Sequence, residues 1–239
     1  MTIAKRGVDE ETWQFKRLDS VVGWDSHNYV TMTLDERGHL HVSGNMHVDP
    51  LVYFRTERPG EIPSLRPIPA MVGRLEKRCT YPRFMAGPKG ELIFTYRDGA
   101  SGRGNQIYNV YEEQEQTWQR LLDQPLLDGK GLMNAYPVGP ARGRDGLFHL
   151  CWVWRDTPDC STNHDVSYAR SRDLVHWETA AGEPVHSFAT LMNDLRTVVR
   201  NTMRRSKVSD NPETTFTIVT TPTPLQKKAL QLLEVPVPT

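Results

Sequence analysis

The stretch Asp35-Glu-Arg-Gly-His-Leu-His-Val42 decides the fold, because similar stretches occur twice more along the chain. They are Gly87-Pro-Lys-Gly-Glu-Leu-Ile-Phe94 and Gly143-Arg-Asp-Gly-Leu-Phe-His-Leu150, each with a turn glycine before an alternating strand. The glycines stand at positions 38, 90 and 146, so the spacings are 52 and 56 residues. Repeats of roughly 40 to 55 residues with several strands per unit are typical of β-propeller blades.

A tryptophan follows the same repeat. Trp13, Trp118 and Trp177 each come near the end of a unit, before a linking segment that contains proline or glycine. We therefore predict an all-β chain with blades at about 27–68, 81–123 and 136–180, preceded at 11–18 by the last strand of another blade. A β-sandwich with accidental internal similarity is the alternative.

The composition excludes several functional classes. The chain has 239 residues, with 29 Lys and Arg balanced by 29 Asp and Glu. Without a charge excess or a long basic run, neither nucleic acid nor an anionic membrane surface is an expected partner. No apolar run approaches the roughly 18 to 20 residues that span a bilayer. Three cysteines, an odd number, argue against a disulfide framework.

Two segments are expected. Residues 1–185 carry the blade signals, and residues 186–239 form a divergent, Pro-rich tail with helical patterns at 189–206 and 224–233. Three blades and a strand do not close a propeller ring, so open blade edges are predicted to favour self-association.

The repeat also aligns polar residues. His27, Tyr81 and Tyr136 occupy equivalent places, 9 to 11 residues before their turn glycines, at the start of each predicted innermost strand. These places surround one mouth of the central axis, where the side chains can meet a ligand. For a single tyrosine followed by proline, packing at a strand entry is the alternative.

Five runs together carry a family resemblance: Trp24-Asp-Ser-His-Asn28, Tyr81-Pro-Arg-Phe84, Tyr96-Arg-Asp-Gly-Ala-Ser-Gly102, Ala135-Tyr-Pro137 and Asn163-His-Asp-Val-Ser-Tyr-Ala-Arg-Ser-Arg-Asp173. They resemble the BNR-4 repeat proteins, a group that includes seven-bladed polysaccharide lyases of the ulvan lyase type. The resemblance spans residues 11 to 185. Ser171-Arg-Asp-Leu-Val-His-Trp177 is also similar to the Asp-box turn of sialidase-like propellers, with Leu174 where that turn prefers glycine.

The resemblance implies β-elimination on an acidic, uronate-containing polysaccharide or oligosaccharide. Such a reaction needs a base for the C5 proton, a cation for the carboxylate and an acid for the departing oxygen. By similarity, His27 and Tyr81 transfer the protons, with the choice of base and acid left open. Arg97 clamps the carboxylate, unless it simply pairs with Asp98. By the same similarity, the residues expected to bind substrate are Asn28, His47 and Tyr136.

No cofactor is required for this chemistry. Cys160 and His164 have a spacing that suits zinc, and the resemblance implies a structural metal near them. The alternative is a hydrogen-bonded pair of His164 and Asp165.

This chain differs from the BNR-4 repeat proteins in ways that leave other functions as alternatives. Its members run to about twice this length, so a truncated, non-catalytic fragment that binds glycan or nothing is one alternative. A sialidase-like hydrolase built on Arg55, Arg97 and Arg170 is a weaker one. The resemblance implies a secreted or periplasmic protein, yet residues 1–19 have no apolar signal core, so the compartment stays open.

Overall fold

The computed structural model describes residues 1–185, and these form antiparallel β-sheets with almost no helix. Two single 3₁₀ turns, η1 (Ile62–Ser64) and η2 (Cys160–Thr162), are the helical elements of this part of the chain. The predicted all-β class is therefore confirmed. The helical segments predicted at 189–206 and 224–233 lie outside the described residues. No helix within residues 1–185 is long and apolar enough to cross a membrane.

The first sheet contains β3 (Val30–Leu34), β4 (Leu40–Gly44), β6 (Tyr53–Thr56) and β7 (Leu65–Pro67), in that order. The turn between β3 and β4 is the first repeated motif. Asp35 accepts the backbone N–H groups of Arg37 and His39, and Gly38 takes a φ of 84° that favours glycine. The motif thus forms a hairpin turn that the Asp35 carboxylate stabilises.

The second sheet contains, in order, β11 (Thr117–Arg120), β10 (Arg103–Glu112), β9 (Leu92–Ala100), β8 (Cys79–Ala86) and β5 (His47–Asp49). The short β12 (Leu127–Asp128) also pairs with β10. Most residues of β9 are buried on both faces, which fits a strand in a sheet covered from both sides.

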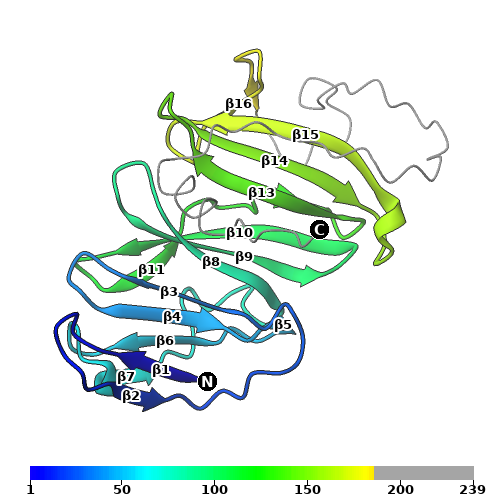
Figure 1. Ribbon diagram of the computed structural model, residues 1–239. Coiled ribbons are helices and arrows are strands. Elements are labelled where there is room, and N and C mark those ends of the chain that lie inside the picture. Colours follow the sequence, from blue (N-terminus) through cyan, green and yellow to red (C-terminus); the bar gives the residue numbers. More distant parts are fainter. Residues whose placement is uncertain (186–239) are drawn as a thin grey trace, which may run out of the picture. The chain divides into compact units, whose positions relative to one another are not determined.

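The third sheet follows the same plan, with β13 (Asn134–Arg142), β14 (Phe148–Arg155), β15 (Asn163–Ser171), β16 (Trp177–Glu178) and β17 (Pro184–Val185). Figure 1 shows the three sheets side by side in chain order, with β8 to β11 between the other two. Each predicted repeat range holds most strands of one antiparallel sheet, except that β5, within 27–68, pairs with β8 of the second sheet.

Two hydrophobic cores fill the spaces between these sheets. One joins the first and second sheets through residues such as Met46, Tyr53, Phe94 and Trp118. The other joins the second and third sheets, with Ile93 facing Leu150, Trp152 and Trp154. Burial of these large side chains, at roughly 25 cal/mol per Å² of apolar surface, is the main force that stacks the sheets.

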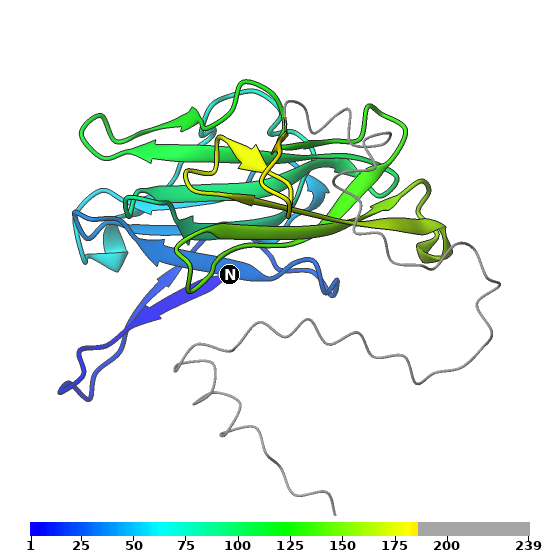
Figure 2. The same cartoon turned by 90° about the horizontal axis from the view of Figure 1, so that it is seen from above.

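The N-terminal hairpin differs from the prediction for 11–18. The predicted strand exists as β2 (Gln14–Arg17), but it pairs with β1 (Thr2–Lys5) in a separate two-stranded ribbon. Figure 2 shows this ribbon extending away from the larger sheets. Ile3 and Leu18 attach its base to a third core with Val42 and Phe54.

The predicted Asp-box forms the turn between β15 and β16. Asp173 accepts the backbone N–H groups of Val175 and His176 at 2.9 and 2.7 Å. Burial acts to raise the pKa of Asp173, but these hydrogen bonds and those of the His176 ring and Ser171 outweigh it and lower the pKa to about 2. Leu174 has a φ of 64°, which explains why glycine is preferred at that position of the turn.

Candidate functional site

A bulge in β8 presents Tyr81. Thr80 lies opposite Arg97 and Arg83 lies opposite Thr95, so two residues of β8 face one residue of β9. Pro82 has no N–H to give to the ladder, which favours a bulge there. Tyr81 takes a φ of 59°, a left-handed conformation that costs a non-glycine residue about 1–2 kcal/mol. Strain of this kind is concentrated at functional sites.

His27 meets Tyr81 from the first sheet. It lies in the turn before β3, and its Nε2 is 3.0 Å from the Tyr81 hydroxyl. Burial raises the pKa of Tyr81 above its ordinary value, even though the charge of Arg97 acts in the opposite direction. The phenol therefore keeps its proton at neutral pH.

Asp25 and His47 complete a cluster behind His27. The rings of His27 and His47 stack with centroids 3.9 Å apart and planes 13° apart. Asp25 contacts the Nδ1 atoms of both rings, with 2.6 Å between its Oδ2 and Nδ1 of His47. The backbone N–H of His27, followed by its ring, holds the pKa of Asp25 well below its usual range. Asp25 is therefore an anion at neutral pH.

Arg97 is a buried cation without a carboxylate partner among residues 1–185. It is 3% exposed, and its Nη2 donates to Thr80 Oγ1 at 3.2 Å. Its Nε is buried with no hydrogen-bond partner among the described residues. Asp98 does not pair with it, because successive strand residues point to opposite faces. The guanidinium carbon lies 5.0 Å from the centre of the Tyr81 ring.

Tyr136 lies on β13 and faces the same space. Its ring is 6.5 Å from the Tyr81 ring in an edge-to-face arrangement. Its hydroxyl is 2.8 Å from Ser101 Oγ and accepts a hydrogen bond from Arg155 Nη1 at 3.1 Å. Burial acts to raise the pKa of Tyr136, but the bond to Ser101 and the charges of Arg97 and Arg155 outweigh it and lower the pKa.

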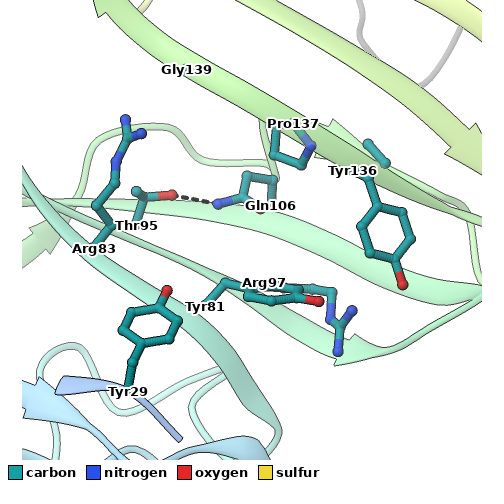
Figure 3. A pocket seen from close by; sticks show the side chains of 10 residues that line it. Tyr29, Tyr81, Arg83, Thr95, Arg97, Gln106, Tyr136, Pro137 and Gly139 are labelled. Atoms are coloured by element: carbon teal, nitrogen blue, oxygen red, sulfur yellow. Dashed lines mark hydrogen bonds between the residues drawn. The ribbon is translucent and has the colours of Figure 1, made fainter. Parts of the chain in front are cut away.

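These side chains border a cavity of about 360 Å³ between β8, β9, β10 and β13. Figure 3 shows Arg97 extending toward Tyr136 on one side of the cavity, with Arg83 on the other. Gln106 and Thr95, joined by a hydrogen bond, lie between the two arginines. The lining holds two arginines and no carboxylate, so the cavity favours an anionic ligand. The complete lining is Tyr29, Tyr81, Arg83, Thr95, Arg97, Gln106, Ala135, Tyr136, Pro137 and Gly139.

Tyr136 is expected to be the first tyrosine to ionise when the protein is titrated to alkaline pH. Burial raises the pKa of each of the other seven tyrosines. In an ultraviolet titration of tyrosinate absorbance, Tyr136→Phe should remove the earliest step, whereas Tyr168→Phe should leave it in place. If the earliest ionisation step persists in Tyr136→Phe, Tyr136 is not the tyrosine with the lowest pKa, and the prediction is wrong.

Arg55 and Arg170 are engaged elsewhere, which disfavours a three-arginine site. Arg55 donates to Gln116 Oε1 at 2.7 Å and contacts the Tyr111 hydroxyl. Arg170 forms an ion pair with Glu178 at 2.6 Å. Neither residue lines the cavity that contains Arg97.

Asn28 lies beside the cluster without a ring or charge contact of its own. Its backbone N–H donates to the Asp25 carbonyl at 2.9 Å and closes the turn that carries His27. Its Oδ1 is buried and has no hydrogen-bond partner among residues 1–185.

The candidate metal ligands predicted from the sequence are not brought together with a third ligand. Cys160 is exposed on η2, and His164 bonds Asp156 at 2.9 Å and Asp165 at 2.8 Å. Within residues 1–185, the group whose ligand atoms lie within 4.8 Å of one another is Asp25, His27 and His47.

Comparison with known proteins identifies the family. A family model described as a BNR repeat-containing family member matches residues 1–218. The chain belongs to this BNR repeat family. No curated protein matches the chain.

Solved structures share the fold of this BNR repeat protein. The polysaccharide lyase Uly1 superposes with a TM-score of 0.60 and 17% identity, over 73% of this chain and 46% of the lyase. A PL25 ulvan lyase superposes with a TM-score of 0.54 and 16% identity, over 70% of this chain and 44% of the lyase. That lyase has also been solved bound to -[GlcA(1-4)Rha3S]-. The chain therefore spans less than half the length of these lyases, and the similarity concerns the fold.

Sequence reasoning gave no role to several residues of the BNR repeat protein's site, among them Asp25, Arg83, Ser101 and Arg155. Asp25 could have been found from its position two residues before His27, a spacing that lets a carboxylate reach the same turn. Ser101 lies within a run that carries the family resemblance but was assigned no role, and Arg155 gave no local signal. Arg155 reaches Tyr136 only because β14 returns beside β13 and places Arg155 opposite Asn134.

Proposed function

We propose that this protein is a polysaccharide lyase that cleaves uronate-containing glycans by β-elimination. The observation that carries the proposal is Arg97, a buried guanidinium with no carboxylate partner in the described part of the chain, beside the hydrogen-bonded pair of His27 and Tyr81. A buried, uncompensated charge destabilises a fold unless a ligand of opposite charge binds it. A uronate carboxylate supplies that charge, and the planar guanidinium matches it.

The roles of His27 and Tyr81 follow from their protonation. Because the pKa of Tyr81 is raised by burial, its phenol is the acid that protonates the departing O4 oxygen. His27 is the base that removes the C5 proton in this proposal, since its Nε2 lies beside the hydroxyl of Tyr81, a residue that lines the cavity, and carries a lone pair in the Nδ1–H form. Arg97 stabilises the negative charge that develops on the carboxylate.

His47 and Tyr136 position the sugar in this proposal. His47 stacks on His27 and limits the directions its ring can take. The Tyr136 hydroxyl, held by Ser101 and Arg155, offers a hydrogen bond at the far side of the cavity from Arg83. Asn28 is proposed as a further polar contact, because its Oδ1 has no partner in the described part of the chain.

We also infer that the three larger sheets are successive blades of an incomplete propeller of the seven-bladed type. The support is the repeat of about 52 to 56 residues, the antiparallel order within each sheet and the likeness in fold to the two lyases. In this proposal an acidic glycan is the partner, and the uncovered blade edges permit self-association.

The direct test is an assay with a glucuronate-containing polysaccharide such as ulvan. Cleavage by elimination produces an unsaturated uronate, which is followed by its ultraviolet absorbance. We expect this absorbance to rise with the wild-type chain and to fall to background with His27→Ala. His176→Ala, a histidine on the exposed turn after β15, is the matched control and should keep wild-type activity.

Other outcomes separate the alternatives. New reducing ends without unsaturated product would indicate a hydrolase. Glycan binding without either product would indicate a non-catalytic propeller. Full activity in His27→Ala would place the reaction elsewhere.

A further inference from the structure

Asp25 connects the two stacked histidines through a single carboxylate. Its Oδ1 accepts the backbone N–H of His27 at 2.8 Å and contacts Nδ1 of the same residue. Its Oδ2 lies 2.6 Å from Nδ1 of His47. Both imidazoles therefore present the same nitrogen to the same anion, while their planes lie almost parallel at 3.9 Å.

This arrangement determines where the histidine protons lie. An ionised carboxylate only accepts hydrogen bonds, so both Nδ1 atoms must carry hydrogen. A neutral imidazole has one N–H, and Nε2 of His27 is then left with its lone pair toward the Tyr81 hydroxyl, 3.0 Å away. In the other tautomer, Nε2 would carry the hydrogen and would donate it to the Tyr81 oxygen. Nε2 would then have no lone pair with which to act as a base.

We propose that Asp25 is a positioning residue that holds His27 and His47 in the Nδ1–H form and completes a Tyr81–His27–Asp25 chain. The kinetic part of this inference rests on the proposed lyase function, whereas the tautomer assignment stands without it. The charged and titratable groups that face the cluster are His47 and Tyr81, with Arg97 over the Tyr81 ring and Asp49 on the backbone N–H of His47.

A second hydrogen-bonded series of an aspartate, a histidine and a tyrosine offers an internal comparison. Asp145 lies 3.0 Å from Nε2 of His149, whose Nδ1 lies 2.7 Å from the Tyr168 hydroxyl. There the carboxylate holds Nε2 and the phenol holds Nδ1, the reverse of the order at His27. None of these three residues lines the cavity of Arg97. Asp145→Asn therefore changes an equivalent bond away from the proposed site.

The test is nitrogen-15 NMR of the histidine rings in the wild type, Asp25→Asn and Asp145→Asn. Asparagine keeps the shape of aspartate, but one of its two head atoms is a donor, so it cannot accept from both Nδ1–H groups. At a pH where the same spectra show both imidazole rings to be neutral, the wild type should show His27 and His47 as Nδ1–H tautomers. Signals are assigned with His27→Gln and His47→Gln.

In Asp25→Asn at least one of the two histidines should change to the Nε2–H form, while Asp145→Asn should affect His149 alone. In the lyase assay, Asp25→Asn should lower kcat by roughly 10²- to 10⁴-fold with a much smaller change in KM, the usual range for impaired proton transfer. Circular dichroism checks that the variant folds.

Each result decides the inference. Wild-type His27 in the Nε2–H form, or an unchanged tautomer in Asp25→Asn, would overturn it even if the lyase activity is real. Nδ1–H signals that depend on Asp25 would support it even if no substrate is cleaved. A zinc-dependent shift of both rings in the wild type would show that the three residues form a metal site instead.

Discussion

Replacing Arg97 with methionine is expected to lower kcat/KM of the lyase reaction by roughly 10³-fold, the upper end of the loss when one preorganised charge-stabilising donor is removed. The same variant should unfold at the wild-type temperature or above it. Arg97 is 3% exposed and has no carboxylate partner in residues 1–185, so its charge is desolvated without compensation in the free protein. An apolar side chain of similar length relieves that cost.

The matched control is Arg55→Met. Arg55 bonds Gln116 and contacts the Tyr111 ring outside the cavity, so this variant should keep its activity and lose stability. Arg97→Met is therefore expected to lose activity without losing thermal stability, and Arg55→Met to lose thermal stability without losing activity. A strongly destabilised Arg97→Met would mean that the guanidinium is a structural group.

Replacing Tyr81 with phenylalanine is expected to lower kcat by roughly 10²- to 10⁴-fold, because the acid of the reaction is removed. The ring remains and keeps its contacts with Arg97 and Tyr136, and the hydroxyl bonds only His27 among the described residues. KM and the unfolding temperature should therefore change little. The measurement is the initial rate of unsaturated uronate formation across substrate concentrations.

Tyr168→Phe is the control for this substitution, since it also removes a hydroxyl that is hydrogen-bonded to a histidine. It should leave kcat unchanged. Equal losses in the two variants would indicate a general effect of tyrosine hydroxyls on the fold, and an active Tyr81→Phe would assign the acid to another group.

The repeat predicted the sheets well because turn glycines are a local requirement. Gly38, Gly90 and Gly146 all have positive φ, between 81° and 93°, and each ends one strand and starts the next. Such positions are visible in a sequence because few other residues tolerate them. The same spacing aligned His27, Tyr81 and Tyr136, which the structure brings to one cavity and its border.

The rest of the site depends on contacts that no local pattern encodes. The second contact of Asp25, to Nδ1 of His47, joins residues 22 positions apart that no local pattern relates. Arg155 is 19 residues from Tyr136, and strand pairing brings them together. The range 27–68 was predicted as one unit, yet β5 within it leaves the first sheet for the second. Asn45 and Val48, with φ near 60°, turn the chain there.

This exchange of β5 has a mechanical consequence. His47 is anchored to β8 by strand pairing, and Val48 N–H donates to Thr80 Oγ1, the same oxygen that receives Arg97. Separation of the first sheet from the second requires the pairing of β5 with β8 to break. The same movement would draw the rings of His27 and His47 away from the Arg97 guanidinium. The cluster of Asp25, His27 and His47 therefore helps to hold the two sheets together. The geometry of the proposed site and the packing of the N-terminal half should be lost in a single unfolding step.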